Sequence, residues 1–371
     1  MTELPSDKQA IADGCYFDEK KAEHICQFFE KFLCVSTGRL AGQPLKLLGW
    51  QRDFLRCLNG WRRADGSRRF KKCFLAVAKK NSKSFLCSGL ALYFGLADGE
   101  QQPEVVLAAS ARDQAEIVYR EAKNMVLGSS AIKGMCRVVD SRKKIMLPSG
   151  SGYIRVVSSD AGRQEGINAS LVVMDELHAH KSRDLYDCLV YSGIARKSPL
   201  VISITTAGHD KDSFCFEEWQ YARKVLNGDV VDTHLLPIIY SAEGMDYESP
   251  DAWRAANPSL GVIIDEEEFR SSFNEAKESP VRWSSFVRYR LNAWYDSDQS
   301  WLSSEKWALG DDADFDISDL TGATCYGGLD LSAVSDLTSL SLYFPDYEAL
   351  LSWSWIPRDN AMKRTEKNHA P

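Results

Sequence analysis

The sequence predicts an α/β protein whose main part is a doubly wound, mainly parallel sheet. Three observations predict it. From Phe70 to about residue 240, apolar runs of strand length alternate with longer runs of helical period. One of these strands leads through a basic loop into a helix that begins near Lys83, and a later strand ends on Asp175 and Glu176. Alternating strands and helices pack as a parallel sheet with helices on both faces, so one sheet accommodates them all.

Four segments follow one another along the chain. Residues 1–60 are predicted to be mostly helical, and residues 61–240 to form the α/β domain. Residues 241–320 are acidic and rich in tryptophan, which favours a helical connector. Residues 321–371 contain three strand-like runs of a second, partial α/β domain. We expect this last domain to be incomplete, because about 50 residues are too few for an independent two-layer fold.

The elements expected within these segments follow from hydrophobic period and turn residues. Helices are expected at Ala22–Leu33, Trp50–Leu58, Lys83–Leu96, Arg112–Leu127, Asp184–Arg196 and Phe214–Leu226. Strands of the main sheet are expected at Lys72–Val77, Glu104–Ala108, Leu171–Met174, Leu200–Thr205 and Thr233–Ile239, with a hairpin at Lys144–Leu147 and Gly152–Ser158. The strands of the last segment are expected at Cys325–Leu331, Thr338–Phe344 and Ala349–Trp355.

The composition is that of an ordinary globular protein. The chain has 371 residues, 44% hydrophobic side chains and a net charge of −7. No apolar run approaches the length of a membrane span, and the charged start is unlike a signal peptide. The ten cysteines have no metal-binding spacing, so we expect reduced thiols in a cytosolic protein. The stretch from Arg39 to Lys80 is basic, which suits binding of the phosphates of a nucleotide or a nucleic acid. A solvated surface explains these charges equally well.

The loop from Ala78 to Ser84 has the place and the charge of a phosphate-binding loop. Such loops surround phosphates with backbone N–H groups and a helix N-terminus, while a lysine adds a point charge. Lys83 is placed for the β- and γ-phosphates, and the Ser84 hydroxyl for Mg²⁺. Val77 and Ser82 stand where the usual glycines would be. The loop alone therefore leaves two interpretations open, a nucleotide site and a basic turn without a ligand.

The strand that ends on Asp175 and Glu176 favours the nucleotide interpretation. A carboxylate at the end of a buried strand costs free energy unless it is solvated, paired or bound to a cation. Asp175 is the predicted Mg²⁺ ligand, and Glu176 the predicted base that activates the attacking water. Thr205 and Thr206 leave the next strand beside the same crevice, where they are placed to sense the γ-phosphate. The alternatives are an ordinary strand-end pair of carboxylates and two threonines that merely favour a strand.

Several motifs resemble those of the large terminase subunit of tailed phages, the ATP-driven motor and nuclease that packages viral DNA, and above all its HK97-like branch. The resemblance runs from about Leu48 to the end of the chain. In chain order, the motifs are an adenine-recognition motif, a phosphate loop, a Walker B strand end, a coupling motif and two linker signatures: Leu48-Gly49-Trp50-Gln51-Arg52, Lys79-Lys80-Asn81-Ser82-Lys83-Ser84, Met174-Asp175-Glu176-Leu177-His178, Ile204-Thr205-Thr206-Ala207-Gly208, Ala256-Asn257-Pro258 and Arg290-Leu291-Asn292-Ala293-Trp294.

The resemblance implies a P-loop ATPase of the ASCE type that binds ATP and Mg²⁺. Gln51 would read the edge of the adenine, and Thr205 and Thr206 would couple hydrolysis to motion. The nucleotide would be held by the loop residues Lys79, Lys80, Asn81, Ser82, Lys83 and Ser84 together with Asp175. Lys79 stands where the family usually has an arginine that stabilises transition-state charge, and lysine lacks the planar fork of arginine. Arg163 is a second candidate for that role.

The same resemblance implies the partners of a packaging motor. They are double-stranded DNA, a portal protein and a small terminase subunit. The chain would work as a ring of identical subunits on the portal, in the cytoplasm of the bacterial host and without a membrane.

The last three strands resemble the start of the family's RNase H-like endonuclease domain. Such nucleases cleave with two divalent metals, such as Mg²⁺ or Mn²⁺, clamped by several carboxylates. Asp330 would be the central ligand and Asp336 a second one, while the remaining carboxylates of the family come from later strands. We therefore expect a partial metal site, and no DNA cleavage by this chain alone.

Two other functions stay open. The run from Asp175 to His178 also fits the DExH pattern of helicase-like, DNA-dependent ATPases, although residues 241–371 lack the strand–helix alternation of a second motor domain. A prophage remnant that binds nucleotide without turnover would explain the altered loop and the partial last domain.

Histidine and tryptophan residues near these motifs have simpler explanations than ligand binding. His178 and His180 are expected to pack or form hydrogen bonds rather than hold a metal. Packing is also expected for the tryptophans between residues 280 and 310, which are Trp283, Trp294, Trp301 and Trp307.

Overall fold

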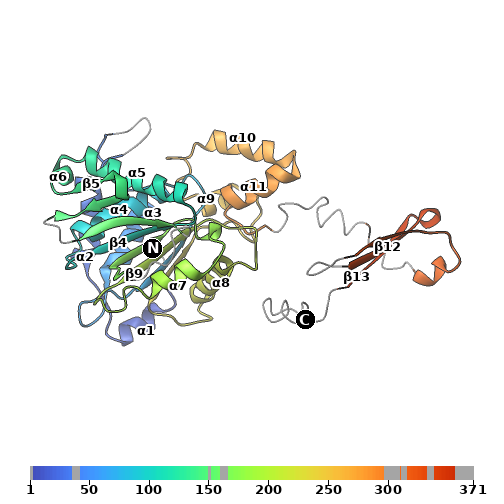
Figure 1. Cartoon of the computed structure of the whole chain (residues 1–371), viewed down its shortest axis with the longest axis horizontal. Helices are drawn as coiled ribbons and strands as arrows, with labels where there is room; N and C mark the ends of the chain where they lie inside the picture. Colours follow the sequence, from blue (N-terminus) through green and yellow to red (C-terminus); the bar gives the residue numbers. More distant parts are fainter. Residues whose placement is uncertain are drawn as a thin grey trace. The chain divides into compact units, whose positions relative to one another are not determined.

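The protein folds as two compact units, Met1–Gln299 and Ser300–Pro371 (Figure 1). The computed structural model describes residues 3–35, 42–148, 152–158, 166–295, 310, 316–331 and 338–355. Within that part of the chain, no helix is long and apolar enough to cross a membrane.

An eight-stranded sheet forms the centre of the first unit. Its six strands from β10 to β7 are mutually parallel, and β6 and β5 continue it in antiparallel pairing. The order across the sheet is β10 (Leu235–Ile239), β3 (Lys72–Ala76), β9 (Leu200–Thr205), β8 (Leu171–Met174), β4 (Glu104–Ala109), β7 (Tyr153–Ser158), β6 (Lys144–Met146) and β5 (Arg137–Val139). The prediction of a mainly parallel sheet is confirmed.

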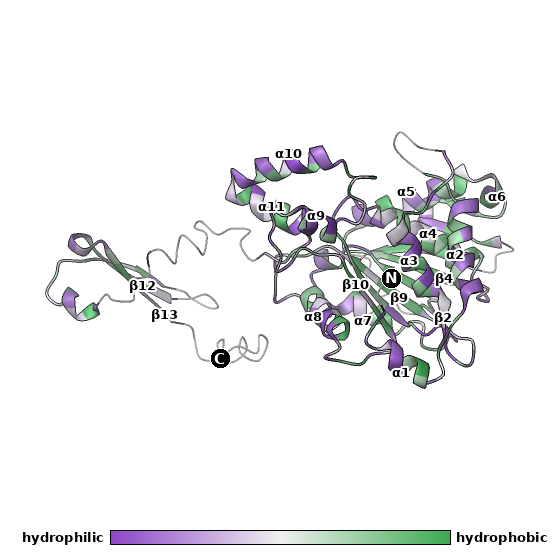
Figure 2. Ribbon diagram, turned by 180° about the vertical axis from the view of Figure 1, so that it is seen from behind, coloured by the Kyte–Doolittle hydropathy of each residue, from purple (hydrophilic) through white to green (hydrophobic). Residues whose placement is uncertain are grey.

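Helices cover both faces of this sheet, as a doubly wound fold requires. The helices of the first unit, apart from those after residue 240, are α1 (Asp7–Ala12), α2 (Glu19–Phe32), α3 (Gly49–Gly60), α4 (Lys83–Leu96), α5 (Arg112–Gly128), α6 (Ser130–Lys133), α7 (Asp184–Val190) and α8 (Phe214–Asn227). Alternate residues of each strand face opposite sides. One set, including Leu75 and Val173, packs with α2 to α5, and the other, including Phe74 and Val172, packs with α7 and α8. Figure 2 shows these apolar strands between helices whose outer faces are polar.

Most predicted elements lie where the sequence placed them, and α4 has the predicted bounds. The main difference is α7, which ends at Val190 rather than Arg196. The Ser192 hydroxyl donates to the carbonyl of Leu189 at 2.7 Å. A Cβ on Gly193 would lie only 2.3 Å from the Ala169 carbonyl oxygen. The backbone at Gly193 therefore lies against the backbone at Ala169, and the chain turns here instead of continuing the helix.

Three helices follow the sheet within the same unit: α9 (Pro250–Ala256), α10 (Glu266–Lys277) and α11 (Pro280–Arg290). We call them the helical segment. Their core is aromatic, and the rings of Trp253 and Phe286 each contact those of Phe269 and Phe273. Trp283 stacks on Phe286, with 11° between the ring planes. The tryptophan-rich stretch therefore builds a small core of its own, and Trp301 and Trp307 lie outside the described residues.

Short elements that the sequence did not predict complete the first unit. The paired strands β1 (Tyr16–Phe17) and β2 (Trp61–Arg62) have two residues each, and β5 has three. Runs this short carry no measurable period. Among the described residues, 3₁₀ turns are found at η1 (Asp140–Arg142), η3 (Leu177–Ala179), η4 (Ile317–Leu320) and η5 (Pro345–Tyr347).

The described part of the second unit is an antiparallel meander of β11 (Tyr326–Asp330), β12 (Thr338–Phe344) and β13 (Ala349–Trp355). Large apolar side chains stay exposed on these strands, including Leu329, Leu350 and Trp353. A sheet of this kind needs a covering layer to bury one face.

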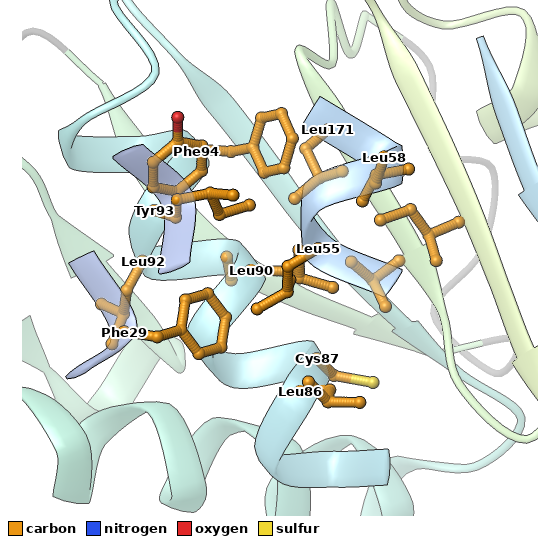
Figure 3. Packing of buried hydrophobic residues seen from close by; sticks show 14 of the residues in the cluster. Phe29, Leu55, Leu58, Leu86, Cys87, Leu90, Leu92, Tyr93, Phe94 and Leu171 are labelled. Carbon is orange, nitrogen blue, oxygen red and sulfur yellow. The ribbon is translucent and has the colours of Figure 1, made fainter. Parts of the chain in front are cut away.

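Replacing Gly89 with alanine is expected to destabilise the first unit. Gly89 lies on the face of α4 that meets α2, and its added Cβ would lie 2.4 Å from Phe29 Cε1. Figure 3 shows Phe29 packed beside the residues of α4. Overpacking of this kind costs about 1–3 kcal/mol of unfolding free energy. Chemical denaturation checks it, with Gly134→Ala as the control, since nothing lies within 4 Å of that added Cβ. Equal stability of the two variants would contradict the prediction.

Candidate active site

Three neighbouring strands of the sheet end together at the candidate site. In the parallel order β3, β9, β8, residue Ala76 pairs with Thr205, and Ser203 pairs with Met174. The carboxyl ends of parallel strands meet at one edge of a sheet, which is where open α/β folds bind ligands. The phosphate loop, the paired carboxylates and the two threonines leave these three strands at that edge. Sequence motifs far apart in the chain are thus adjacent in space.

The loop between β3 and α4 has the curled backbone of an anion-binding loop. Lys80 and Ser82 have φ values of 72° and 61°, in the left-handed region that glycine adopts most easily. For serine this conformation costs roughly 1–2 kcal/mol. Ser82 stands where such loops usually have a glycine, and it keeps the left-handed backbone that a glycine would adopt. Lys83 begins the helix, is 6% exposed, and donates from Nζ to the Val77 carbonyl at 3.1 Å.

Asn81 fastens this loop to the helical segment. Its amide nitrogen donates to the Ala78 carbonyl and to Asn257 Oδ1, each at 3.1 Å. Its Oδ1 accepts from the Ser259 N–H at 3.1 Å. Asn257 in turn donates to the Arg290 carbonyl at 2.6 Å. Since all these amide atoms are buried, the bonds hold the strained loop in place. A contribution of the Asn81 side chain to nucleotide binding stays a prediction.

Asp175 and Glu176 place two carboxyl groups beside the Lys83 ammonium. Asp175 is 6% exposed, and burial together with the Glu176 charge raises its pKa to about 7. Glu176 has a left-handed backbone, with φ 49°, and its N–H donates to Asp175 Oδ1 at 3.0 Å. Lys83 Nζ lies 3.9 Å from Glu176 Oε1, and burial lowers the pKa of Lys83. Burial makes the charged form of the Asp175 carboxyl costly. A divalent cation bound beside it would stabilise that charged form, so the site suits such a cation.

The unfolding free energy of the free protein is expected to fall as the pH rises from about 4 to about 7. Asp175 titrates near 3.8 when unfolded and near 7 when folded, so the folded state binds the extra proton in that window. The stabilisation from this extra proton is fully present below the unfolded-state pKa of 3.8, and it is lost as the pH rises through the folded-state pKa of about 7. Asp175→Asn should remove this component. Denaturation of both proteins across the pH range checks it, and parallel pH profiles would contradict it.

The end of β9 is bound tightly to its surroundings. Thr205 and Thr206 are fully buried, and the Thr205 Oγ1 accepts from the His178 N–H at 3.1 Å. The N–H of Ala207 donates to Asn292 Oδ1 at 2.7 Å, and Asn292 donates to the Tyr240 carbonyl at 2.6 Å. The next residue must be glycine, because a Cβ on Gly208 would lie 2.8 Å from the Trp294 ring. The coupling motif and the second linker signature are therefore in direct contact.

Lys79 points at the helical segment. Its N–H donates to the Tyr289 carbonyl at 2.9 Å, and its ammonium lies 3.4 Å from the centre of the Tyr289 ring. Arg288 lies over the same ring, with its guanidinium 4.3 Å from the centre, and its Nη1 is 3.2 Å from His209 Nδ1. Tyr289 and Arg288 could not be predicted from the sequence, since neither belongs to a nucleotide motif.

Gln51 lies at the start of α3, and the neighbouring Trp50 links this helix to the helical segment. Trp50 donates from Nε1 to the Ser259 hydroxyl at 3.0 Å. Gln51 is 3% exposed, and its Oε1 accepts from the Leu48 N–H at 3.0 Å. That oxygen satisfies the first turn of the helix, so a role of Gln51 in reading adenine stays a prediction.

Of the two predicted metal ligands of the second unit, the structure describes only Asp330. Asp330 ends β11 and is exposed, while Asp336 and the candidate arginine Arg163 lie outside the described residues. In the described ranges, no three histidine, cysteine or acidic side chains gather as a metal site. A metal-binding role for Asp330 stays a prediction.

Comparison with known proteins identifies the family of both parts of the chain. Residues 49–224 match the model of the terminase large subunit ATPase domain, and residues 238–370 match that of the terminase large subunit endonuclease domain. The large terminase subunit of Enterobacteria phage HK97 is 27% identical over 363 residues, which cover 95% of this chain and 68% of the relative. Protein YmfN of Escherichia coli K12 is 28% identical over 212 residues, 55% of this chain and 46% of the relative.

A solved structure has the same fold. The crystal structure of the HK97 bacteriophage large terminase aligns with a TM-score of 0.65 at 24% identity, covering 95% of this chain and 71% of that one. This chain therefore spans between about half and about seven tenths of the length of these relatives.

Proposed function

The chain belongs to the terminase large subunit family, and on that premise we propose that it is the ATP-hydrolysing motor of a phage DNA-packaging machine. The observation that carries the proposal is the meeting of three strand ends at one edge of the sheet. It brings Lys83, Asp175, Glu176 and Thr205 into one site, in which Glu176 is half-buried and the other three are buried. ATP hydrolysis would supply the free energy, and the helical segment fastened to the phosphate loop would receive the movement.

Each residue of the site has a proposed part in hydrolysis. Lys83 and the N–H groups at the start of α4 bind the phosphates. Ser84 and Asp175 hold Mg²⁺, which neutralises phosphate charge when bound. Glu176 accepts the proton of the attacking water and orients it. Asp175 is buried beside a second carboxylate, that of Glu176, and the two repel each other. A bound cation would offset this repulsion, which favours Mg²⁺ binding at the site.

Lys79, Gln51 and the two threonines complete the proposed site. Lys79 stabilises charge on the phosphates as a point charge, held toward the helical segment by Tyr289. Gln51 recognises adenine, and Lys80 adds positive charge at the entrance. Thr205 and Thr206 pass the loss of the γ-phosphate to the Asn292 contact, and so to the helical segment.

The partners proposed for the motor follow from its family. It would translocate double-stranded DNA into a procapsid as a ring on the portal protein, with a small terminase subunit that delivers the DNA. It would act in the cytoplasm of the bacterial host. In the second unit, Asp330 and Asp336 would contribute to a metal-dependent nuclease site, which needs further carboxylates before it can cut concatemeric DNA.

Mg²⁺-dependent ATP hydrolysis by the purified chain, measured with and without nucleic acid, tests the proposal. Turnover that linear double-stranded DNA stimulates would support a packaging motor. Stimulation by single-stranded DNA alone would favour a helicase-like ATPase instead. Nucleotide binding without turnover under every condition would contradict the motor and favour a remnant.

Replacing Tyr289 with alanine is expected to lower kcat by a few-fold to roughly tenfold, because the Lys79 ammonium loses the ring that holds it. Tyr289→Phe keeps the ring and should retain most of the activity. Steady-state ATP hydrolysis by the two variants checks this. If the phenylalanine variant were as impaired as the alanine variant, the hydroxyl contact with Arg288 would matter instead of the ring.

A further inference from the structure

The last three strands of the large sheet, β7, β6 and β5 (Figure 1), carry basic side chains on one face. Lys144 of β6 lies directly opposite Arg155 of β7, and Arg137 of β5 lies opposite Met146 of β6. Residues two apart on a strand point to the same side of a sheet, and so do direct partners on neighbouring strands. Arg137, Lys144 and Arg155 therefore lie on one side of the sheet, and we call these three residues the basic face.

The basic face is on the side of these strands that points away from the core of α4 and α5. Ile145 and Ile154, which point to the other side, belong to that core. Arg137 is exposed, and Lys144 and Arg155 are half-buried. The three cations are therefore within reach of a large partner in solution.

Two of the three cations lie close to one another. Lys144 Nζ is 3.4 Å from the centre of the Tyr153 ring, and the Arg155 guanidinium carbon is 5.9 Å from the same centre. Burial lowers the pKa of Lys144, and the charges of Arg155 and Arg142 lower it further. Like charges directly opposite on neighbouring strands destabilise a sheet. An anion bound to both cations would offset this repulsion.

The carboxylates of the described residues do not neutralise the basic face. In that part of the chain, none of its three cations forms an ion pair. Glu104 of the neighbouring strand β4 accepts at Oε2 from the Tyr153 hydroxyl at 2.7 Å and from the Asn168 N–H at 3.3 Å. This carboxylate serves those two donors, and three cations outnumber it, so the face stays positive.

The basic face lies apart from the proposed nucleotide site. Four strand spacings separate β7 from β3, which leads into the phosphate loop, and at about 4.8 Å each they amount to roughly 19 Å. The anion that fits the face is therefore a different one from the nucleotide at Lys83. Arg137 and Arg155 start two strand spacings apart, which is roughly 10 Å. A row of cations of this width matches a chain of phosphates better than a single phosphate group.

We propose that Arg137, Lys144 and Arg155 form a surface that holds double-stranded DNA by its phosphate backbone. A translocating motor must hold DNA of any sequence, and contacts to phosphates carry no sequence information. The choice of DNA among polyanions rests on the proposed function, whereas the basic face itself rests on the fold. Because β7 is joined through β4 to β8, DNA held here would move with the sheet that carries Asp175.

Removing two of the cations without changing side-chain length much tests this surface. We expect Lys144→Gln/Arg155→Gln to lower the affinity of the full chain for mixed-sequence DNA of about 30 base pairs by roughly ten- to a hundredfold in about 0.1 M salt. The slope of log affinity against log salt concentration should become shallower by about 1.8, since each phosphate contact contributes about 0.9. Fluorescence anisotropy without nucleotide measures both quantities. A chain that binds DNA in this way but hydrolyses no ATP would contradict the proposed function and leave this surface standing.

The matched control removes the same two kinds of charge elsewhere. Arg254→Gln/Lys277→Gln changes exposed residues of α9 and α10, each of which pairs with a glutamate. Its affinity and salt slope should stay near those of the wild-type chain. Equal weakening in the two double variants would show attraction by net charge alone and would overturn the proposal. Unchanged affinity in Lys144→Gln/Arg155→Gln would also overturn it, and would leave the face to an acidic protein surface.

Two further measurements separate DNA contact from a folding effect. In the unaltered chain, DNA should protect Lys144 from an amine-acylating reagent, read by mass spectrometry, while Lys277 stays reactive. Equal labelling of Lys144 with and without DNA would overturn the proposal. Thermal denaturation of Lys144→Gln/Arg155→Gln should give an unchanged or higher midpoint, because a like-charge pair is removed. A lower midpoint with wild-type DNA affinity would show a structural role and would overturn the proposal.

Discussion

Replacing Glu176 with glutamine is expected to abolish ATP turnover while leaving nucleotide binding intact. Glutamine has the shape of glutamate and can still lie beside Lys83 and His178, which are 3.9 Å and 3.2 Å from the Glu176 oxygens, but it cannot accept a proton from water. Loss of a general base lowers kcat by about 10²–10⁴-fold. Because the binding contacts of the phosphate loop are untouched, the affinity for ATP should stay within a few-fold of wild type. Steady-state hydrolysis and titration with a fluorescent nucleotide measure the two quantities separately.

A carboxylate outside the site provides the control for this experiment. Glu217 lies on α8 and pairs with Arg183, with 61% of its side chain exposed. Glu217→Gln makes the same chemical change without touching the site, so turnover should not change. Substantial turnover in Glu176→Gln would contradict the assignment of the base. Asp175 would then be the next candidate, since its pKa near 7 suits proton transfer at neutral pH.

The parts of the fold and site that could be predicted are those with a local signal. Alternating apolar runs placed the sheet strands, and the basic loop followed by an apolar run placed the start of α4 at Lys83. Asp175 and Thr205 could be placed at one edge because parallel strands put their carboxyl ends together. The strand order itself was not predictable. β9 lies between β3 and β8, so the coupling motif is adjacent to both halves of the nucleotide motif.

The contacts that bind the phosphate loop to the helical segment could not be predicted. The bond between Asn81 and Asn257 joins residues 176 positions apart, and no period or motif in a single sequence pairs them. The contact between Tyr289 and Lys79 could not be predicted either, because it forms only when the fold brings α11 to the loop. His178 was expected to pack or form hydrogen bonds, and its hydrogen-bond partners Thr205 and Thr206 become visible only when both strand ends are in place.

Replacing Lys83 with alanine is expected to weaken ATP binding by roughly ten- to a hundredfold, and turnover with it. A hydrogen bond to a charged group contributes about 1.5–3 kcal/mol, and no other described side chain supplies a buried ammonium at the start of α4. Lys71→Ala is the control, because Lys71 is exposed and lies at the opposite end of the β3 strand. Unchanged affinity in Lys83→Ala would contradict the assignment of the phosphate site to this loop.

The same variant should also change the pH dependence of the free protein. Lys83 lowers the pKa of Asp175, while burial and Glu176 raise it. Without the ammonium, only the hydrogen bond from the Glu176 N–H still lowers this pKa, so the folded-state pKa of Asp175 should move above 7. The loss of unfolding free energy with rising pH would then continue to a higher pH than in the wild-type protein. Denaturation of Lys83→Ala and Lys71→Ala between pH 5 and 9 measures it. An unchanged profile would mean that the ammonium and the carboxyl pair do not share one buried site, and that the nucleotide assignment lacks its electrostatic basis.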